Sequence, residues 1–373
     1  MHDAELDAVK GLKNLVGEFQ IKNLRHEKDV TVYVNVVACG VRSLSLEWDS
    51  HAPKSKYNAT SPEDGKLFQD LEELAVNGFN GVTLFSPDIS SKMVKLTLRR
   101  CANCQYLPSL DQLLHLKVLL LDEMIKLEYI SNKDSSSAST TFFPCLQELW
   151  LTELPKLRGW CKNGVNDLTA SFPCLSKLVI EDCPNLATMP LFPTLEEGLV
   201  LDTTYWRPFE LTMKHATAAY DEASSSTSPP PSAPLSKLKN LSIVGIKDCK
   251  VDEIKWETLN CLRFLRFDSL PNLTTLPKGL QRVTSLQELH VWRCGIKEIP
   301  SWINKLEQLK KLAIRVCSSL KSLPEEIRSL HSLETLEIED CNTLLRRCEK
   351  EIGADWEKIV PIPYKRLGPI SGR

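Results

Sequence analysis

Cysteine and histidine are the residue types in this sequence that could perform covalent or metal chemistry. The chain has 13 cysteines and seven histidines, and Cys101 and Cys104 have the CxxC spacing of many zinc sites. A structural zinc site needs four ligands, and the sequence offers no second pair at matching spacing. The histidines do not show the HExxH spacing of a metalloprotease helix, and no nucleophile elbow is present. We therefore predict no metal site, no catalytic residue and no enzyme.

Phosphate binding is the other chemistry that a short motif could reveal. A phosphate-binding loop of the form GxxxxGK[ST] cradles phosphates with its backbone N–H groups and its lysine. Gly65 and Lys66 supply the Gly-Lys step, but neither the first glycine nor the hydroxyl residue is in place. No cofactor is therefore expected.

The cysteines recur at a fixed place in a repeated pattern. The segments LQELHVWRC (286–294), LKKLAIRVC (309–317) and LETLEIEDC (333–341) place apolar residues three and five positions after the first leucine, and a cysteine eight positions after it. The pattern has regular starts at Val16, Val41, Leu71, Met93, Leu116, Leu146, Leu175, Leu238, Leu262, Leu286, Leu309 and Leu333, with one further copy at Leu195. A cysteine at this offset packs as a small apolar residue. We therefore interpret Cys101, Cys183, Cys294, Cys317 and Cys341 as core residues.

The spacing of this pattern indicates leucine-rich repeats. The last five starts lie 23 or 24 residues apart, within the range of that repeat class. We predict an α/β repeat solenoid, a horseshoe with a parallel β-sheet on its concave face and a mostly irregular or short-helical convex side. The copy at Leu195 has one extra residue, which we interpret as a bulge at Gly198.

Two segments interrupt or end the pattern. Residues 203–235 contain the Ser/Pro-rich stretch ASSSTSPPPSAP, which buries too little apolar surface to order itself. We therefore predict an N-terminal repeat block at 1–202, a flexible insertion at 203–235 and a C-terminal repeat block at 236–344. We interpret residues 345–373 as a cap and tail, with Trp356 covering the last repeat.

The side chains between the buried positions of each strand point outward and are free to bind a partner. We predict a protein-binding patch from the residue types that concentrate binding energy, tryptophan and arginine, with their neighbours. Its members are Trp150, Phe264, Arg266, His290, Trp292 and Arg315. Two alternatives stay open: the aromatic residues pack on one another as cross-strand pairs, and Arg315 forms a solvated ion-pair ladder with Glu337 and Glu339.

Composition excludes several classes of function. A formal net charge of −2 gives no general attraction to nucleic acid or to an anionic membrane, and an acidic end formed by Glu334, Glu337, Glu339 and Asp340 weighs against nucleic acid as well. We find no apolar run long enough to span a membrane and no secretion signal. With an odd number of cysteines, this predicts reduced thiols and a cytoplasmic or nuclear location.

Several stretches resemble plant intracellular immune receptors of the coiled-coil nucleotide-binding leucine-rich-repeat class. FPCLQELWLTELPKLRGW (143–160) and FPCLSKLVIEDCPNLATMP (172–190) are similar to their repeats. The closing stretch RRCEKEIGADWEKIVPIP is the most specific, since Cys348, Gly353, the pair Asp355 and Trp356, and Pro363 match the usual ending of these receptors.

The resemblance covers the repeat region of such a receptor and not its nucleotide-binding module, to which ADP or ATP would belong. It implies a protein-recognition module that senses pathogen effectors or guarded host proteins and contributes to autoinhibition in defence signalling. The implied protein partner is an effector, a guarded host protein or the receptor's nucleotide-binding module. The alternative is a stand-alone leucine-rich-repeat scaffold or adaptor outside immunity.

Overall fold

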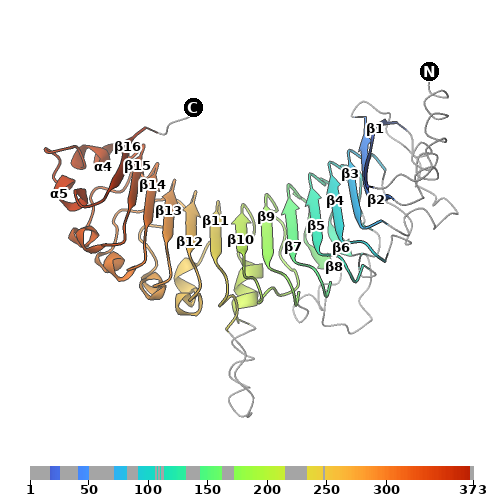
Figure 1. Ribbon diagram of the computed structural model, residues 1–373, viewed down its shortest axis with the longest axis horizontal. Coiled ribbons are helices and arrows are strands. Elements are labelled where there is room, and N and C mark those ends of the chain that lie inside the picture. Colours follow the sequence, from blue (N-terminus) through green and yellow to red (C-terminus); the bar gives the residue numbers. More distant parts are fainter. Residues whose placement is uncertain are drawn as a thin grey trace, which may run out of the picture. The chain divides into compact units, whose positions relative to one another are not determined.

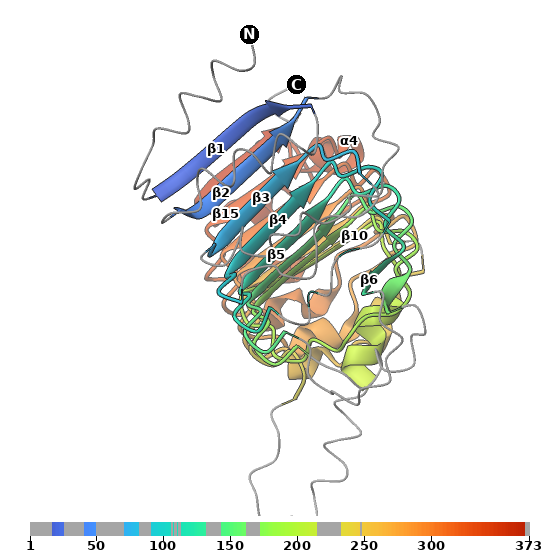
Figure 2. The same cartoon turned by 90° about the vertical axis from the view of Figure 1, so that its right-hand side faces the viewer.

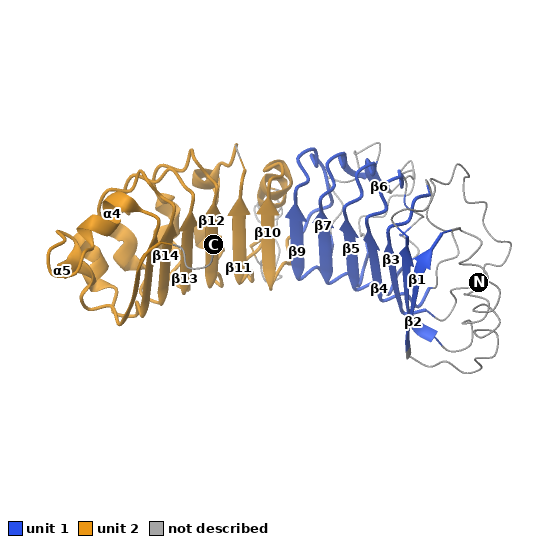
Figure 3. Cartoon of the chain, turned by 90° about the horizontal axis from the view of Figure 1, so that it is seen from above, with its two compact units in different colours: residues 1–192 blue, residues 193–373 orange. Residues whose placement is uncertain are grey.

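The computed structural model describes residues 17–25, 41–49, 71–81, 91–105, 107, 110, 113–131, 143–161, 172–214, 233–246 and 248–369. The chain forms two compact units, unit 1 at residues 1–192 and unit 2 at residues 193–373 (Figure 3). This division lies ten residues before the block boundary that the sequence suggested at residue 202. Each unit is built from the same element, a short strand followed by a returning segment.

The main sheet of unit 1 is parallel, and its strands pair in the order in which they occur along the chain (Figure 2). Its strands are β1 (Gly17–Leu24), β2 (Val41–Trp48), β3 (Glu73–Asn77), β4 (Lys95–Arg99), β5 (Val118–Asp122), β7 (Glu148–Thr152) and β9 (Lys177–Glu181). Two short strands of the returning segments, β6 (Tyr129–Ser131) and β8 (Gly159–Cys161), pair with each other in a second parallel sheet.

Unit 2 repeats this arrangement with β10 (Gly198–Asp202), β11 (Asn240–Val244), β12 (Phe264–Asp268), β13 (Glu288–Trp292), β14 (Lys311–Arg315), β15 (Thr335–Glu339) and β16 (Tyr364–Gly368). Its returning segments carry the 3-10 helices η2 (Val251–Glu253), η3 (Trp256–Thr258), η4 (Lys278–Arg282), η5 (Ser301–Lys305) and η6 (Glu325–Ser329). The α-helices α4 (Asn342–Arg347) and α5 (Trp356–Ile359) follow the last repeat. In Figure 1 these short helices lie to one side of the strands of unit 2.

Register within each sheet aligns the aliphatic residues of successive repeats. Leu289 pairs with Leu312, and Leu312 pairs with Leu336, in a regular parallel ladder. All three side chains are fully buried, and burying each leucine contributes roughly 1.5–3 kcal/mol. A strand follows each of the thirteen predicted starts, although Val16 itself lies outside the described residues. The predicted leucine-rich-repeat solenoid and its parallel sheet are therefore confirmed.

In the main sheet, each strand from β3 to β15 is followed by a residue in the left-handed region, which the pattern did not reveal. Arg293, directly after β13, has φ 48°, and its N–H donates to the carbonyl of Arg315 at 2.9 Å. Ser269 and Val316 hold the same place after β12 and β14, with φ of 53° and 55°. The N–H therefore bonds to the next repeat instead of continuing the strand. Because ordinary side chains occupy these sites, residue type gave no signal for the bend.

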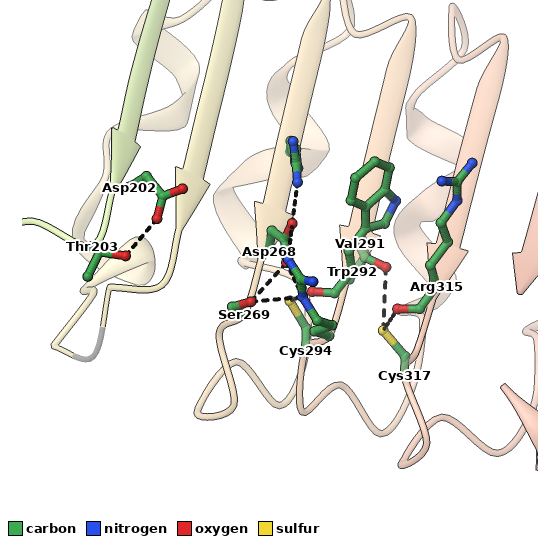
Figure 4. Close-up of polar contacts among 11 residues, drawn as sticks. Asp202, Thr203, Asp268, Ser269, Val291, Trp292, Cys294, Arg315 and Cys317 are labelled. Carbon is green, nitrogen blue, oxygen red and sulfur yellow. Dashed lines mark hydrogen bonds and ion pairs between the residues drawn. The ribbon is translucent and has the colours of Figure 1, made fainter. Parts of the chain in front are cut away.

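Where a cysteine follows the bend, as Cys101, Cys183, Cys294, Cys317 and Cys341 do, it packs in the core. The Sγ atom of Cys317 lies 3.4 Å from the carbonyl oxygens of both Val291 and Arg315 (Figure 4). Burial raises the pKa of Cys317 to about 12 and that of Cys294 to about 11. These thiols therefore stay protonated at neutral pH, and their interpretation as core residues is confirmed.

Two local expectations for residues 195–235 differ from the structure. Gly198 pairs directly with Asn240 in a regular ladder, so the extra residue of this repeat precedes the strand and no bulge forms at Gly198. Residues 207–214 are helical, with Trp206 and Phe209 buried and their ring centroids 4.6 Å apart. The prediction of a flexible insertion rested on the average composition of residues 203–235. It therefore missed the apolar surface that these two aromatic side chains bury. Residues 215–232 lie outside the described part of the chain.

The C-terminal segment adds a strand to the sheet, because β16 pairs in parallel with β15. Asp355, which is fully buried, accepts hydrogen bonds from the N–H of Leu323 and from the Arg347 guanidinium. Ile359 and Ile362 are buried as well, whereas Trp356 is only half-buried. The described part of this segment is therefore anchored by Asp355 and the isoleucines more than by Trp356.

No helix within the described ranges combines the length and the apolar character that crossing a bilayer requires.

Candidate protein-binding surface

Five of the six predicted patch residues form one cluster on β12, β13 and β14 of unit 2, which we call the Arg–Trp cluster: Phe264, Arg266, His290, Trp292 and Arg315. They meet because Arg266 pairs with His290, and Trp292 pairs with Arg315, in the strand register. The ring centroids of Phe264 and His290 are 4.9 Å apart, and those of His290 and Trp292 are 5.5 Å apart. The cluster is therefore a continuous stack of side chains across three strands.

Trp292 lies at the centre of the Arg–Trp cluster and receives a guanidinium from the strand on either side. The Arg266 guanidinium carbon is 4.1 Å from the indole centroid, and that of Arg315 is 4.7 Å from it. Such cation–π contacts contribute about 0.5–1 kcal/mol when exposed and about 2 kcal/mol when desolvated. Figure 4 shows Trp292 between Asp268 and Arg315.

A buried carboxylate, Asp268, fixes the β12 side of the cluster. Its side chain is fully buried and forms ion pairs with Arg266 and Arg293. Ser269 donates a hydrogen bond to the same carboxylate at 3.0 Å, and Arg293 contacts it through two nitrogens, both within 3.0 Å. Because a bidentate guanidinium–carboxylate contact restricts orientation, this anchor holds the β12 end of the cluster in place.

Two buried carboxylates on β15 fix the other side. Arg315 forms ion pairs with Glu337 at 2.7 Å and with Glu339 at 2.9 Å. Glu337 also receives Lys311 at 2.8 Å, and Glu339 receives Arg366 from β16 at 2.6 Å. The Glu339 side chain is 0% exposed and that of Glu337 is 9% exposed. The interpretation of these pairs as a solvated ladder is therefore wrong, because both acids are buried.

The electrostatics of the cluster follow from this burial. Burial by itself would raise the pKa of Glu337, but hydrogen bonds from Lys311 and Arg315 hold that pKa below its usual value. Burial and the charge of Lys311 lower the pKa of His290, so the imidazole is neutral at pH 7. Glu337 is thus ionised, and the predicted acidic end is not a free negative surface at this position.

Four buried nitrogens of the cluster lack a hydrogen-bond partner among the described residues, and two of them are the Nε atoms of Arg266 and Arg315. The indole N–H of Trp292 and the Nε2 of His290 are buried and have no hydrogen-bond partner among the described residues. The His290 nitrogen lies 3.4 Å from a Glu288 oxygen without hydrogen-bond geometry. Buried polar groups in native proteins normally form hydrogen bonds. The cluster can therefore form further hydrogen bonds with a bound partner.

The sixth predicted residue, Trp150, belongs to unit 1 and has different neighbours. Leu120 and Val179 are its cross-strand partners on β5 and β9. The Lys177 ammonium lies 4.4 Å from the indole centroid, and the indole N–H donates to Glu148 at 3.2 Å. Trp150 is therefore part of a separate surface in unit 1.

Sequence reasoning missed two residues that hold the Arg–Trp cluster together. Asp268 follows Phe267, the last core residue of β12, and pairs with Trp292 in the next repeat, so the repeat register could have identified it. Arg366 lies on β16, whose sequence YKRLG lacks the leucine pattern, and no sequence signal placed it beside Glu339.

The fold is that of a leucine-rich-repeat protein, and two family models agree with this class. A family model described as "Leucine-rich repeat region" matches residues 223–354, and one described as "R13L1/DRL21 LRRs" matches residues 6–124. A leucine-rich-repeat protein of Leptospira interrogans is similar in structure at 19% identity, with a TM-score of 0.46 and 98% of each chain covered.

The most informative relatives come from plants. The Solanum bulbocastanum protein named "Putative disease resistance protein RGA1" is 29% identical over 97% of this chain and 35% of its own length. The similarly named RGA4 protein of that species is 29% identical over 42% of this chain and 17% of its own length. The chain thus spans about a third or less of the curated relatives that it matches. The resemblance of its repeats to those of plant disease resistance proteins is confirmed.

Proposed function

We propose that the chain is the protein-recognition region of a plant intracellular immune receptor, and that it binds a pathogen effector or a guarded host protein in defence signalling. The observation that carries the proposal is the Arg–Trp cluster, in which five outward side chains predicted from the repeat register form one stack held by buried acids. The similarity of the chain to disease resistance proteins supports the proposed role in immunity.

The cluster has the physical character of a binding hot spot. Tryptophan and arginine dominate such sites, where few residues carry most of the binding energy. Asp268 and Glu339 hold the two arginines in place before any partner arrives, so binding loses less side-chain entropy. The unmade hydrogen bonds of Trp292 and His290 add a preference for a partner that can supply polar groups.

We propose that the same module contributes to autoinhibition. In a receptor of this class, a resting state is favoured when the repeat face binds the nucleotide-binding module, and a ligand with higher affinity for the released state shifts the population. In this proposal the chain works in the cytoplasm or nucleus, and its role is binding instead of catalysis.

Capture of partners from plant leaf extract tests the proposal. We expect Trp292→Ala to remove at least one protein that the unchanged chain captures, with the affinity of that purified protein falling about thirtyfold, since hot-spot truncation costs about 2 kcal/mol or more. His331→Ala, an exposed change in unit 2, serves as the control and should capture the same set. Identical capture by the Trp292→Ala chain would refute the cluster as the recognition site.

A further inference from the structure

A second outward surface, in unit 1, combines an apolar row with unpaired negative charge. The row is formed by Leu120, Trp150 and Val179, which are direct cross-strand partners on β5, β7 and β9. Leu120 and Trp150 are half-buried, so part of each apolar side chain meets solvent, whereas Val179 is buried. Leu120 and Trp150 therefore leave apolar surface on the outward face, beside the buried Val179.

An acidic rim runs along the ends of the same three strands. It comprises Asp122, Glu123, Glu153, Glu181 and Asp182. Asp122 and Glu181 lie two residues beyond the apolar row, roughly 6.6 Å along a strand. Glu123, Glu153 and Asp182 lie three residues beyond it. The row and the rim are therefore parallel features separated by about one side-chain width.

Most of the rim charge is not neutralised by a fixed partner. Asp122 lies 3.8 Å from Arg99 and accepts a hydrogen bond from the Thr152 hydroxyl. The carboxylates of Glu123, Glu153 and Asp182 make no ion pair with any described residue, and the last two side chains are exposed. Unpaired like charges on adjacent strands repel one another, so an approaching cation is favoured.

The surface already holds one cation of the chain itself. The Lys177 ammonium sits 4.4 Å from the centroid of the Trp150 ring, and Glu148 accepts the indole N–H at 3.2 Å. An indole face attracts ammonium and guanidinium groups, and the acidic rim attracts them as well. Three independent features, the apolar row, the rim and this internal contact, point to the same chemistry.

We propose that this surface of unit 1 docks a cationic amphipathic segment of a partner protein. The aliphatic side chains of that segment pack on Leu120 and Trp150, and its lysine or arginine side chains face Glu123, Glu153 and Asp182. The inference goes beyond the proposed function, because it uses different residues from the Arg–Trp cluster and names the chemistry of the partner.

Fluorescence polarisation with a labelled amphipathic peptide of leucine and lysine tests the proposal on the full chain. We expect this peptide to bind, while a version with glutamate for lysine and a version with serine for leucine do not. Affinity should fall as salt rises, because exposed charge pairs are screened. Equal binding of the leucine–lysine and serine–lysine peptides would overturn the proposal, since only a diffuse charge attraction would remain.

Substitutions locate the site. Neutralising two exposed acids with Glu153→Gln and Asp182→Asn should weaken peptide binding about fivefold, because each exposed pair contributes modestly. Trp150→Ala should weaken it about tenfold. Neutralising two exposed acids of unit 2 with Glu349→Gln and Glu357→Gln should leave the affinity unchanged; equal losses in both double variants would overturn the proposal.

The two binding proposals fail separately. Trp292→Ala alters the Arg–Trp cluster and should leave peptide binding intact. Glu153→Gln and Asp182→Asn change only exposed side chains. A loss of binding in that double variant, with its free energy of unfolding unchanged, therefore tests the surface even if Trp150→Ala unfolds unit 1.

Discussion

The outward faces of the two units use charge in opposite ways. In unit 2, Arg266 and Arg315 are tied to the buried carboxylates of Asp268 and Glu339, so the charges build a rigid stack around Trp292. In unit 1, Glu153 and Asp182 are exposed and make no ion pair with a described residue. Charge therefore stabilises structure in one unit and stays available to a partner in the other.

Removing Arg315 should have the largest effect on stability. Arg315→Ala leaves Glu339 and Glu337 buried with one fewer cation each, and breaking a buried ion pair costs about 3 kcal/mol or more. Lys177→Ala, the unit 1 counterpart that also places a cation over a tryptophan, should cost less than about 1 kcal/mol because no buried acid depends on it. Urea unfolding of both variants measures the difference; equal losses would remove the contrast between the units.

Acid should weaken unit 2 through Glu337. The folded pKa of Glu337 lies below its ordinary value of 4.5, because hydrogen bonds from Lys311 and Arg315 outweigh the effect of burial. The unfolded chain therefore takes up this proton first, so the free energy of unfolding falls as pH drops below about 5 and continues to fall through the lowered folded pKa. Urea unfolding of the unchanged chain and of Glu337→Gln across this pH range measures the effect. The free energy of unfolding should fall less steeply for Glu337→Gln, and an unchanged slope would contradict the assignment of this pH dependence to Glu337.

Replacing the central tryptophan should have an intermediate effect. Trp292→Leu keeps an apolar side chain but removes the ring that Arg266 and Arg315 contact, which we expect to cost about 1 kcal/mol in thermal unfolding. Phe264→Leu removes an aromatic residue at the edge of the cluster and should cost less. A larger loss for Phe264→Leu would show that the stack is not centred on Trp292.

The smallest effect on stability is expected at the unit 1 rim. Glu153→Gln combined with Asp182→Asn should change the free energy of unfolding by less than about 0.5 kcal/mol, as exposed substitutions usually do. This near-zero result in chemical denaturation separates binding from folding. A loss of about 2 kcal/mol would mean that the rim is structural.

The sequence predicted the strands and the core because the repeat imposes them. Leucines three and five places from each start must be buried, and residues between them must alternate to the outer face. For the same reason the register grouped Arg266, Trp292 and Arg315 in one predicted patch.

Other features could not be predicted because nothing in the repeat encodes them. The left-handed residue after each strand varies from Arg293 to Val316, and β16 carries no leucine pattern. The pairing of Arg366 with Glu339 depends on that unpredicted strand. Whether a charge is neutralised thus depends on contacts between repeats that a single-repeat pattern does not contain.

Amide hydrogen exchange of the chain with and without a captured partner tests recognition by the strand face most directly. The account predicts slowed exchange in β12, β13 and β14 on binding, and no such protection with the Trp292→Ala chain. Protection confined to the returning segments, with β12 to β14 unchanged, would contradict it.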